Sequence, residues 1–461
     1  MKNVIGFVRD SLSGSHRDYT TGNIGRLIIL LAIPMVLEML MESLFGIVDI
    51  YFVARLGADS VATVMLTEST LSIIFGIALG LSMATTAIVA RRIGEKDPDG
   101  AARASVQSII IGFTISVLVG AIGIVFAPGL LQLMGASPAV IATGHRYTAV
   151  LIGGSVVIFL IFLMNAIFRG AGDPALAMRT LWLANAINIV LDPCLINGWG
   201  PFPRLGVMGA AVATTTGRGI GVLYQVHALT TGKSRVHIHL SQMHLEVDIM
   251  WRLIKVSFTG MIQFLIATAS WLGLIRIAST FGTAAVAGYG LGIRIFLFVI
   301  LPSWGLSNAA ATMVGQNLGA GHPERSERAV YQTGFYNMYY MGALSVIFFF
   351  LAPQLAAFFT SDEAVASVAI LLLRILSLGN ICYAWGMVLV QAFNGAGDTA
   401  TPSMINFFCY WMFQIPLAWF LATVIGMGPK GVFTSIPAAE TAMVATSLIV
   451  FRRGAWKRKK I

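Results

Sequence analysis

Three acidic side chains interrupt an otherwise apolar stretch near the start of the sequence. They are Glu38, Glu42 and Asp49. A helix turns by about 100° per residue, so it places the three carboxylates on one stripe that is about 40° wide. An ionisable group in the core of a membrane costs about 2.5–3.5 kcal/mol. Three such groups on one stripe indicate a polar cavity that binds a proton or a cation.

A second polar set lies in a later apolar stretch. Asn185, Asn188 and Asp192 are spaced i, i+3 and i+7, which places them on one face of a helix. Two carboxylates that are close together in a medium of low dielectric repel each other unless one of them binds a proton or a cation. Both sets lie in the N-terminal half of the chain, so we expect a site for a proton or a cation in that half.

Other charged residues in the apolar stretches leave alternatives open. Each acid can instead form a structural ion pair with Arg218, Arg294 or Arg374. Glu68 and Glu440 also lie in apolar stretches, and the sequence assigns no role to these two acids or to Arg294.

The composition restricts the class of protein that can hold these groups. Hydrophobic residues make up 57% of the 461 residues and charged residues 11%, compared with about 25% charged in a soluble domain. The surface of a water-soluble globule needs more charge, and a disordered chain would be much less hydrophobic. The apolar runs are far longer than the alternating segments of about ten residues in a membrane β-barrel. We therefore predict an all-α polytopic membrane protein.

Apolar runs of about 20 residues or more predict the membrane-spanning helices. Twelve runs qualify: 27–54, 61–90, 102–127, 139–168, 174–197, 206–231, 250–277, 284–315, 328–352, 364–393, 400–426 and 431–451. Lys and Arg gather in alternate loops, which predicts a multi-pass protein of the cytoplasmic (inner) membrane with both termini in the cytoplasm. The predicted parts are an N-terminal segment (1–26), a first six-span lobe (27–231), a linker (232–249), a second six-span lobe (250–451) and a basic tail (452–461).

The two halves of the chain repeat at a constant shift of 225 residues. Gly80-Leu81-Ser82 corresponds to Gly305-Leu306-Ser307, and Gly-Ala-Gly-Asp occurs at 170–173 and again at 395–398. Six spans are an even number, so the lobes share one topology and are related by a pseudo-two-fold axis along the membrane normal. Such lobes enclose a central cavity and rock against each other, which is typical of secondary transporters.

The halves differ in their acids. Gln263 stands at the position that corresponds to Glu38, and no carboxylate lies in predicted spans seven to eleven. We therefore expect the cation or proton site in the first lobe. Met35, Met39 and Phe45 lie beside its acids, and with Gln263 they are the expected wall of a substrate cavity, because methionine adapts to varied apolar ligands.

Pro34 lies four residues before the first acid and has no N–H to bond to the carbonyl of Leu30. One interpretation is a fixed kink in the first span. The other is a bend that changes with the charge state of the acids, which would make Pro34 a conformational switch.

Motifs that the sequence lacks exclude several classes of function. There is no Ser-His-Asp arrangement, HExxH motif or P-loop, so we expect neither an enzyme nor an ATP-driven pump, and no cofactor. The net charge of +10 comes from loops and the tail, which argues against nucleic-acid binding and favours contact with anionic membrane lipids. We expect a monomer.

Four stretches resemble the multidrug and toxic compound extrusion (MATE) family: Ile33-Pro34, the run from Val48 to Gly57, the paired Gly-Ala-Gly-Asp turns, and the run from Val314 to Gly321. The resemblance covers nearly the whole chain and points to the damage-inducible and archaeal-like branches. It implies a V-shaped pair of six-helix lobes that exports small organic, often cationic compounds in exchange for H⁺ or Na⁺. A lipid-linked oligosaccharide flippase of the same superfamily, which would have a cationic cavity, and a channel are the alternatives.

The resemblance also implies a cation site in the first lobe, at which Na⁺ can bind Asp49, Asn188 and Asp192. The residues that match the family pattern are Asp49, Asn188 and Asp192, then Asn165 and Tyr147 in the fourth span, and Thr214 (favoured over Thr215 and Thr216) in the sixth. Glu38 and Glu42 depart from the pattern, because many relatives have neutral residues there.

Overall fold

The computed structural model describes residues 2–14, 17–459 and 461, so Met1, Ser15, His16 and Lys460 lie outside the described residues. Every regular element in the described part is a helix, which confirms the all-α class. The first half contains α1 (Lys2–Ser13), α2 (Ile24–Ala54), α3 (Ala58–Gly94), α4 (Pro98–Leu133), α5 (Pro138–Gly153), α6 (Ser155–Ala171), α7 (Pro174–Asn197) and α8 (Val207–Thr230). The second half contains α9 (Val247–Ala278), α10 (Thr283–Gly319), α11 (Pro323–Phe359), α12 (Glu363–Gly395), α13 (Ala400–Asn406), α14 (Ile415–Trp419) and α15 (Pro429–Arg452).

Eleven helices of the described chain are long and apolar enough to cross a membrane, one fewer than the twelve predicted. α5 and α6 together count as one of them. The predicted span 206–231 is the helix α8, which is 24 residues long but is not among the eleven. Its sequence is more polar than the others, because it carries Thr214, Thr215, Thr216 and Arg218 together with several glycines.

Two predicted spans are not single regular α-helices. Span 139–168 consists of α5 and α6, which meet at Gly154. Span 400–426 alternates α13 and α14 with two π-helical segments, η3 (Phe407–Gln414) and η4 (Phe420–Val424). A π-helix has one more residue in each hydrogen-bonded turn than an α-helix, and such segments are frequent at functional sites.

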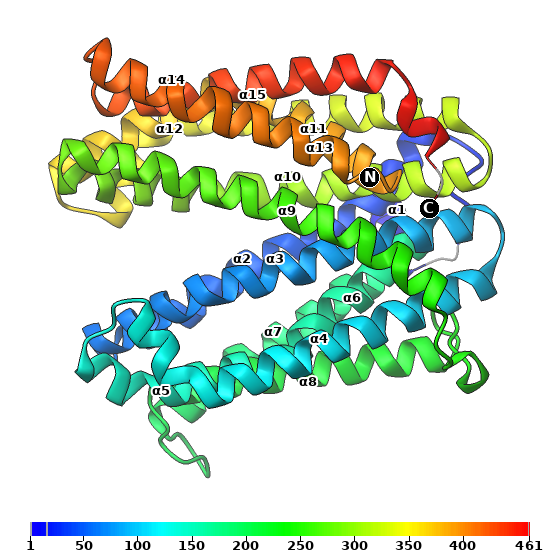
Figure 1. Ribbon diagram of the computed structural model, residues 1–461, viewed down its shortest axis with the longest axis horizontal. Helices are drawn as coiled ribbons and strands as arrows, with labels where there is room; N and C mark the ends of the chain where they lie inside the picture. The colour runs from blue at the N-terminus through cyan, green and yellow to red at the C-terminus, as the bar shows by residue number, and fades with distance from the viewer. Residues whose placement is uncertain (1, 15–16, 460) are drawn as a thin grey trace.

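The helices of the two halves form two groups (Figure 1). The helices α2 to α8, which we call the N-lobe, lie mostly below those from α9 to α15, which we call the C-lobe, in this view. Both termini lie toward the same end of the long axis, which we call the termini end.

Glycines related by the repeat let the two lobes touch. A Cβ atom at Gly94 of α3 would lie 2.0 Å from the carbonyl oxygen of Gln316 on α10, and one at Gly319 would lie 2.1 Å from that of Arg91. Both Gly94 and Gly319, and both Arg91 and Gln316, are 225 residues apart, so the contact is symmetric. Only glycine, which has no Cβ, permits this approach of α3 and α10.

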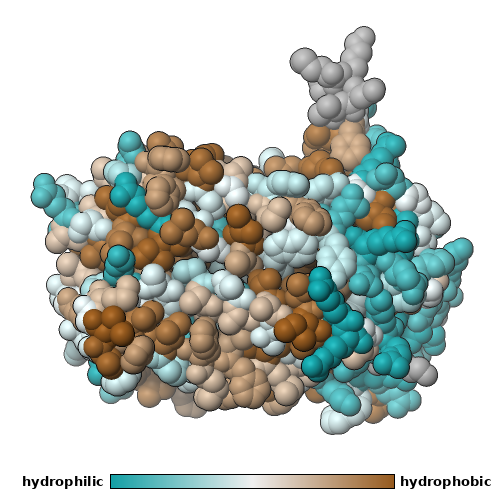
Figure 2. Space-filling model, turned by 90° about the horizontal axis from the view of Figure 1, so that it is seen from above, coloured by the Kyte–Doolittle hydropathy of each residue, from teal (hydrophilic) through white to brown (hydrophobic). Residues whose placement is uncertain are grey.

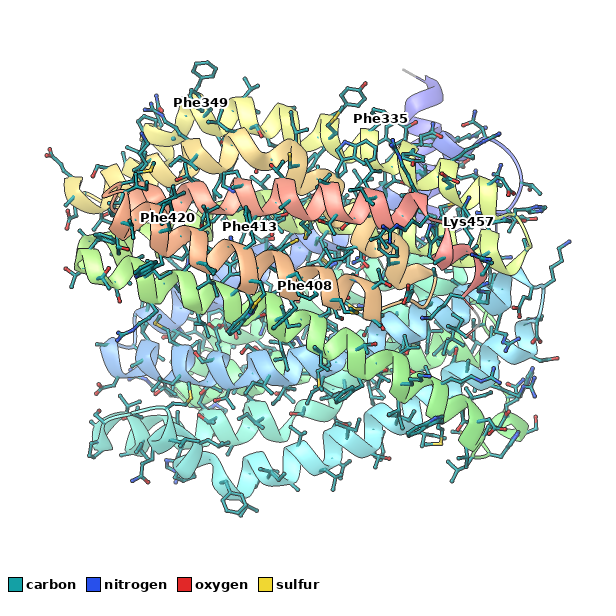
Figure 3. All side chains as sticks on the ribbon, turned by 45° about the horizontal axis from the view of Figure 1, so that its top comes forward. Phe335, Phe349, Phe408, Phe413, Phe420 and Lys457 are labelled. Carbon is teal, nitrogen blue, oxygen red and sulfur yellow. The ribbon has the colours of Figure 1, made fainter. Side chains whose placement is uncertain are left out.

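The outer surface is largely apolar. Figure 2 shows hydrophobic residues over much of one face and hydrophilic residues gathered toward the termini end. Large side chains such as Val125 and Phe350 are 69% and 70% exposed, and Figure 3 labels Phe335 and Phe349 on α11, at the outer edge of the C-lobe. Such a surface suits lipid rather than water, and the chain is a multi-span membrane protein.

Candidate functional site

The side chains of α7 and α8 form a buried polar group. Asn188 Nδ2 donates hydrogen bonds to Asp192 Oδ1 at 3.3 Å and to Thr214 Oγ1 at 3.1 Å, which ties the two helices together. Asn188 Oδ1 and Asp192 Oδ2 are buried and accept no hydrogen bond from any described residue. Because a buried acceptor without a donor is unfavourable, a proton or a cation at these oxygen atoms would lower the free energy.

Asp49 and Tyr147 face this group from α2 and α5. The carboxylate of Asp49 is near enough to Asp192 for their charges to interact, and Tyr147 is near both acids. Tyr147 is only 3% exposed. The structure thus brings together five of the six residues predicted for ion coupling. We call Asp49, Tyr147, Asn188, Asp192 and Thr214 the Asp192 cluster.

The sixth residue, Asn165, belongs to a different polar group. Its Nδ2 donates to Glu38 Oε1 at 3.3 Å, and its Oδ1 accepts from Gln225 Nε2 at 2.6 Å. Arg169 Nη1 forms an ion pair with the same Glu38 oxygen at 2.8 Å. Asn165 and Arg169 are one turn apart on α6, so both side chains lie on the same face of this helix and reach Glu38 of α2. We call these four residues the Glu38 cluster.

The remaining acid of the stripe on α2, Glu42, pairs with Arg218 of α8. The distance from Arg218 Nη2 to Glu42 Oε1 is 3.3 Å, and the guanidinium lies 5.5 Å from the centroid of the Phe45 ring. Arg218 is buried, whereas Arg294 and Arg374 are exposed. Of the three arginines that the sequence offered as partners, Arg218 therefore provides the ion pair.

A central cavity lies between the two lobes and is lined by residues of both. Its polar wall residues in the N-lobe are Glu38, Glu42, Ser82, Thr86, Asn165, Arg169 and Arg218, and those in the C-lobe are Trp304, Asn308, Gln391 and Asn394. Both glutamates on α2 thus reach the cavity, and each has an arginine beside it. Apolar side chains such as Leu79, Met83 and Phe162 complete the wall, so the cavity suits an organic molecule with apolar and polar parts.

The four residues predicted for the cavity wall are placed differently. Met39 lines the central cavity. Met35 is fully buried, because Gly305 lets α10 approach its backbone closely. Phe45 packs against an arginine side chain, and Gln263 is buried within the C-lobe. Met35, Phe45 and Gln263 are not among the described residues that line this cavity.

The sequence of each half of the chain matches the model of a known protein family. The sequence model of the MatE family matches residues 34–194 and again residues 258–420, once in each half of the chain. The chain is a member of the MATE family.

Relatives of this MATE protein include multidrug resistance proteins. The probable multidrug resistance protein YoeA of Bacillus subtilis is 23% identical over 95% of this chain and 96% of its own length. The probable multidrug resistance protein NorM of Thermotoga maritima is 24% identical over 94% of this chain and 93% of its own length.

Solved structures have the same MATE fold. A crystal structure of MATE in the straight conformation has a TM-score of 0.89 and 26% identity, and covers 96% of this chain and 98% of its own. One in the bent conformation has a TM-score of 0.87 and 26% identity, and covers 98% of both chains. The MATE family consists of ion-coupled transporters, so the prediction that this chain is a transporter and not an enzyme is confirmed.

The two lobes of this MATE protein are joined at the termini end by the two Gly-Ala-Gly-Asp turns. Gln316 Nε2 of the C-lobe donates to the carbonyl oxygen of Gly170 at 2.9 Å. Arg91 Nη2 of the N-lobe donates to the carbonyl oxygen of Ala396 at 3.4 Å. Because the two donors, Arg91 and Gln316, are related by the repeat, each lobe donates a hydrogen bond to the Gly-Ala-Gly-Asp turn of the other.

The N-terminal segment adds a further link between the lobes. The hydroxyl of Tyr19 donates to the carbonyl oxygen of Gly172 in the N-lobe at 3.2 Å, and the carbonyl oxygen of Tyr19 accepts from Asn317 Nδ2 in the C-lobe at 3.3 Å. Burial and the nearby carboxylate of Asp173 raise the pKa of Tyr19 to about 12. The hydroxyl therefore stays protonated and remains a donor at neutral pH.

Pro34 lies inside α2, which continues as an α-helix on both sides of it. The carbonyl of Leu30, which has no backbone donor because residue 34 is proline, accepts a hydrogen bond from Ser11 Oγ of α1 at 2.7 Å. Sequence reasoning missed this contact, since no helix was predicted within residues 1–26 and Ser11 lies 19 residues before Leu30. It also missed Arg169, whose spacing of i+4 from Asn165 was the available signal.

Proposed function

We propose that this MATE transporter is a secondary active exporter that exchanges H⁺ or Na⁺ for small organic, often cationic compounds. The observation that supports it most is the pair of unpartnered oxygen atoms, Asn188 Oδ1 and Asp192 Oδ2, in a buried cluster that Asp49 also faces. Binding of a proton or a Na⁺ ion there removes the repulsion between the two acids. A membrane potential of 100 mV supplies about 2.3 kcal/mol for each charge that moves with the ion.

In the proposed topology the chain crosses the cytoplasmic membrane twelve times, because α8 is added to the eleven candidate spans. Residues 27–231 and 250–451 form the two six-span lobes, and both termini lie in the cytoplasm. The gathering of Lys and Arg in the loops and the tail at the termini end supports this orientation. The lobes touch at that end, so we infer that the central cavity opens to the outer side and that the described state faces outward.

The proposed cycle begins when the outward-facing protein binds H⁺ or Na⁺ at Asp49 and Asp192. The bound ion lowers the affinity of the cavity for its substrate, which leaves to the outer side. The lobes then rock about their contact, and the ion is released to the cytoplasm, where a new substrate binds. Pro34 is the proposed hinge of α2, and similarity to MATE structures in straight and bent conformations supports two shapes of this helix.

The preference for cationic substrates rests on Glu38 and Glu42 in the cavity. Each acid has an oxygen, Oε2, that accepts no hydrogen bond from a described residue. A flippase of anionic lipid-linked sugars would need free cationic groups, whereas Arg169 and Arg218 are both paired with these acids. We also propose membership of the damage-inducible and archaeal-like branches, on the basis of the matching ion-site residues.

Transport by the purified protein in liposomes tests the proposal. H⁺ and Na⁺ gradients are imposed separately, and export of a fluorescent cationic dye is measured. Accumulation against the dye gradient with one of the two ion gradients is expected. Passive conductance with no accumulation under either gradient would instead support a channel.

A further inference from the structure

Glu440 is an acid in the interior of the C-lobe that the proposed cycle does not use. It lies near the middle of α15 and is 3% exposed. The hydroxyl of Tyr410 donates a hydrogen bond to Glu440 Oε1 at 2.9 Å. The other oxygen, Oε2, is buried and accepts no hydrogen bond from a described residue.

The groups that face Glu440 are phenols and a thiol rather than cations. Tyr383 of α12 and Tyr410 and Cys409 of η3 are near its carboxylate, and Tyr289 of α10 follows beyond Tyr383. No described Lys, Arg or His lies within ion-pair distance of it. An ionised carboxylate would therefore be buried without a counter-charge, which is costly.

The repeat places this group at a position equivalent to the polar interior of the N-lobe. Glu440 corresponds to Thr215, next to Thr214 of the Asp192 cluster, and Tyr410 corresponds to Asn185 on the polar face of α7. Tyr410 also lies within the π-helix η3, and π-helical turns are frequent at functional sites. The repeat and the π-helix are therefore two independent observations that indicate a functional site around Glu440.

We propose that Glu440 is a second proton-binding site, located in the C-lobe, that takes up and releases one proton in each transport cycle. The proton binds at Oε2 while Oε1 keeps its hydrogen bond from Tyr410. When the lobe exposes the site to the cytoplasm, Oε2 transfers the proton to water and becomes hydrated. One carboxylate and neighbouring phenols offer too few oxygen ligands to replace the water shell of Na⁺, so the site is specific for protons.

This inference rests on the proposed antiport, and infrared spectroscopy tests the site apart from transport. Difference spectra between low and high pH record the carbonyl band of each protonated carboxylic acid. We expect one band to vanish in Glu440→Gln and to persist in Asp49→Asn. In Tyr410→Phe, which keeps the acid, the same band should shift because the carbonyl loses a hydrogen bond. A wild-type spectrum from which Glu440→Gln removes no band would overturn the site.

Transport measurements in liposomes test the role in the cycle. Glu440→Gln should reduce dye accumulation driven by an H⁺ gradient several-fold, while exchange of dye for dye without a gradient continues. Glu363→Gln, which removes an exposed acid of α12, is the matched control and should behave like the wild type. Full H⁺-driven accumulation in Glu440→Gln would overturn the role of Glu440 in the cycle, but it would not contradict the proposed ion site at the Asp192 cluster. If the wild type itself shows no H⁺-driven transport, the proposed role of Glu440 in the cycle is wrong.

Discussion

Asp192 lies on α7 of the N-lobe, whereas the residue 225 positions later, on the C-lobe, is Leu417. Asp49 of α2 likewise corresponds to Leu274 of α9. The C-lobe keeps the helices but replaces these acids with apolar side chains, and Glu440, an acid buried in one of its helices, lies on α15, the counterpart of α8. Two lobes with one ancestral arrangement therefore carry their carboxylates on different helices.

Within the N-lobe, the acids themselves are of two kinds. Glu38 and Glu42 each form an ion pair with an arginine, at 2.8 and 3.3 Å. Among the described residues, Asp49 and Asp192 have no basic partner within 4 Å. A permanent counter-ion removes the need for an exchangeable one, so the unpaired acids are those that can exchange H⁺ or Na⁺. In the proposed cycle, this difference separates the residues of ion coupling from those of substrate binding along one helix.

The largest effect is expected when the unpaired acids of the N-lobe are neutralised. Asp49→Asn and Asp192→Asn should each abolish ion-driven export while leaving expression unchanged, because an amide cannot bind the exchanged proton and holds a cation poorly. Dye export from liposomes is the measurement, and Glu324→Gln, an exposed acid of α11, is the control. Export that persists in both variants would contradict an ion site in the N-lobe, and with it the proposed functional difference between the lobes.

Removal of the basic partner of a paired acid should lower the stability of the protein. Arg169→Gln should lower the free energy of unfolding by about 3 kcal/mol, because it leaves the buried Glu38 carboxylate without its counter-ion. The double variant Glu38→Gln/Arg169→Gln should recover most of this loss. Unfolding in detergent micelles provides the comparison. A double variant no more stable than Arg169→Gln would show that the ion pair is not the cause.

Glu42 should affect substrate choice more than Glu38 does. Its side chain is 30% exposed to the cavity, compared with 1% for Glu38. Glu42→Gln should weaken the binding of a cationic dye several-fold and leave a neutral dye nearly unaffected, and Glu38→Gln should have a smaller effect. Fluorescence titration measures both affinities. Equal losses for the two dyes would leave Glu42 with a structural role alone.

The smallest effect concerns Pro34 and α1. Ser11→Ala should lower the free energy of unfolding by about 1 kcal/mol, because it removes the donor to the Leu30 carbonyl. In Pro34→Ala, residue 34 regains its N–H, and the added Ser11→Ala change should then have little effect. An equal loss in both backgrounds would mean that Ser11 acts elsewhere.

The sequence predicted the helical class, the repeat and most of the spans, because long apolar runs and a constant shift depend on local composition. Helical spacing also placed Asn188 and Asp192 on one face, whereas their grouping with Asp49, which lies on another helix, came from the resemblance to the MATE family. Periodicity cannot reveal where a helix widens, so the π-helical segments around Tyr410 were not foreseen.

Local sequence patterns also could not predict which residues of other helices contact these side chains. The predicted span ended at residue 168, but α6 extends to Ala171 and brings Arg169 to Glu38. The burial of Met35 depends on Gly305, a residue far away in sequence. Such features follow from tertiary packing, which no single stretch of sequence encodes.

The most direct test of the central claim is the affinity of the purified protein for a cationic dye, measured as H⁺ and Na⁺ are varied separately. Two ligands that exclude each other must weaken each other's binding equally. We predict that the wild type binds the dye more weakly at low pH or at high Na⁺. The double variant Asp49→Asn/Asp192→Asn should lose all dependence on Na⁺ and most of the dependence on pH. An ion dependence that is unchanged in this variant would contradict an exchange site at the unpaired acids of the N-lobe.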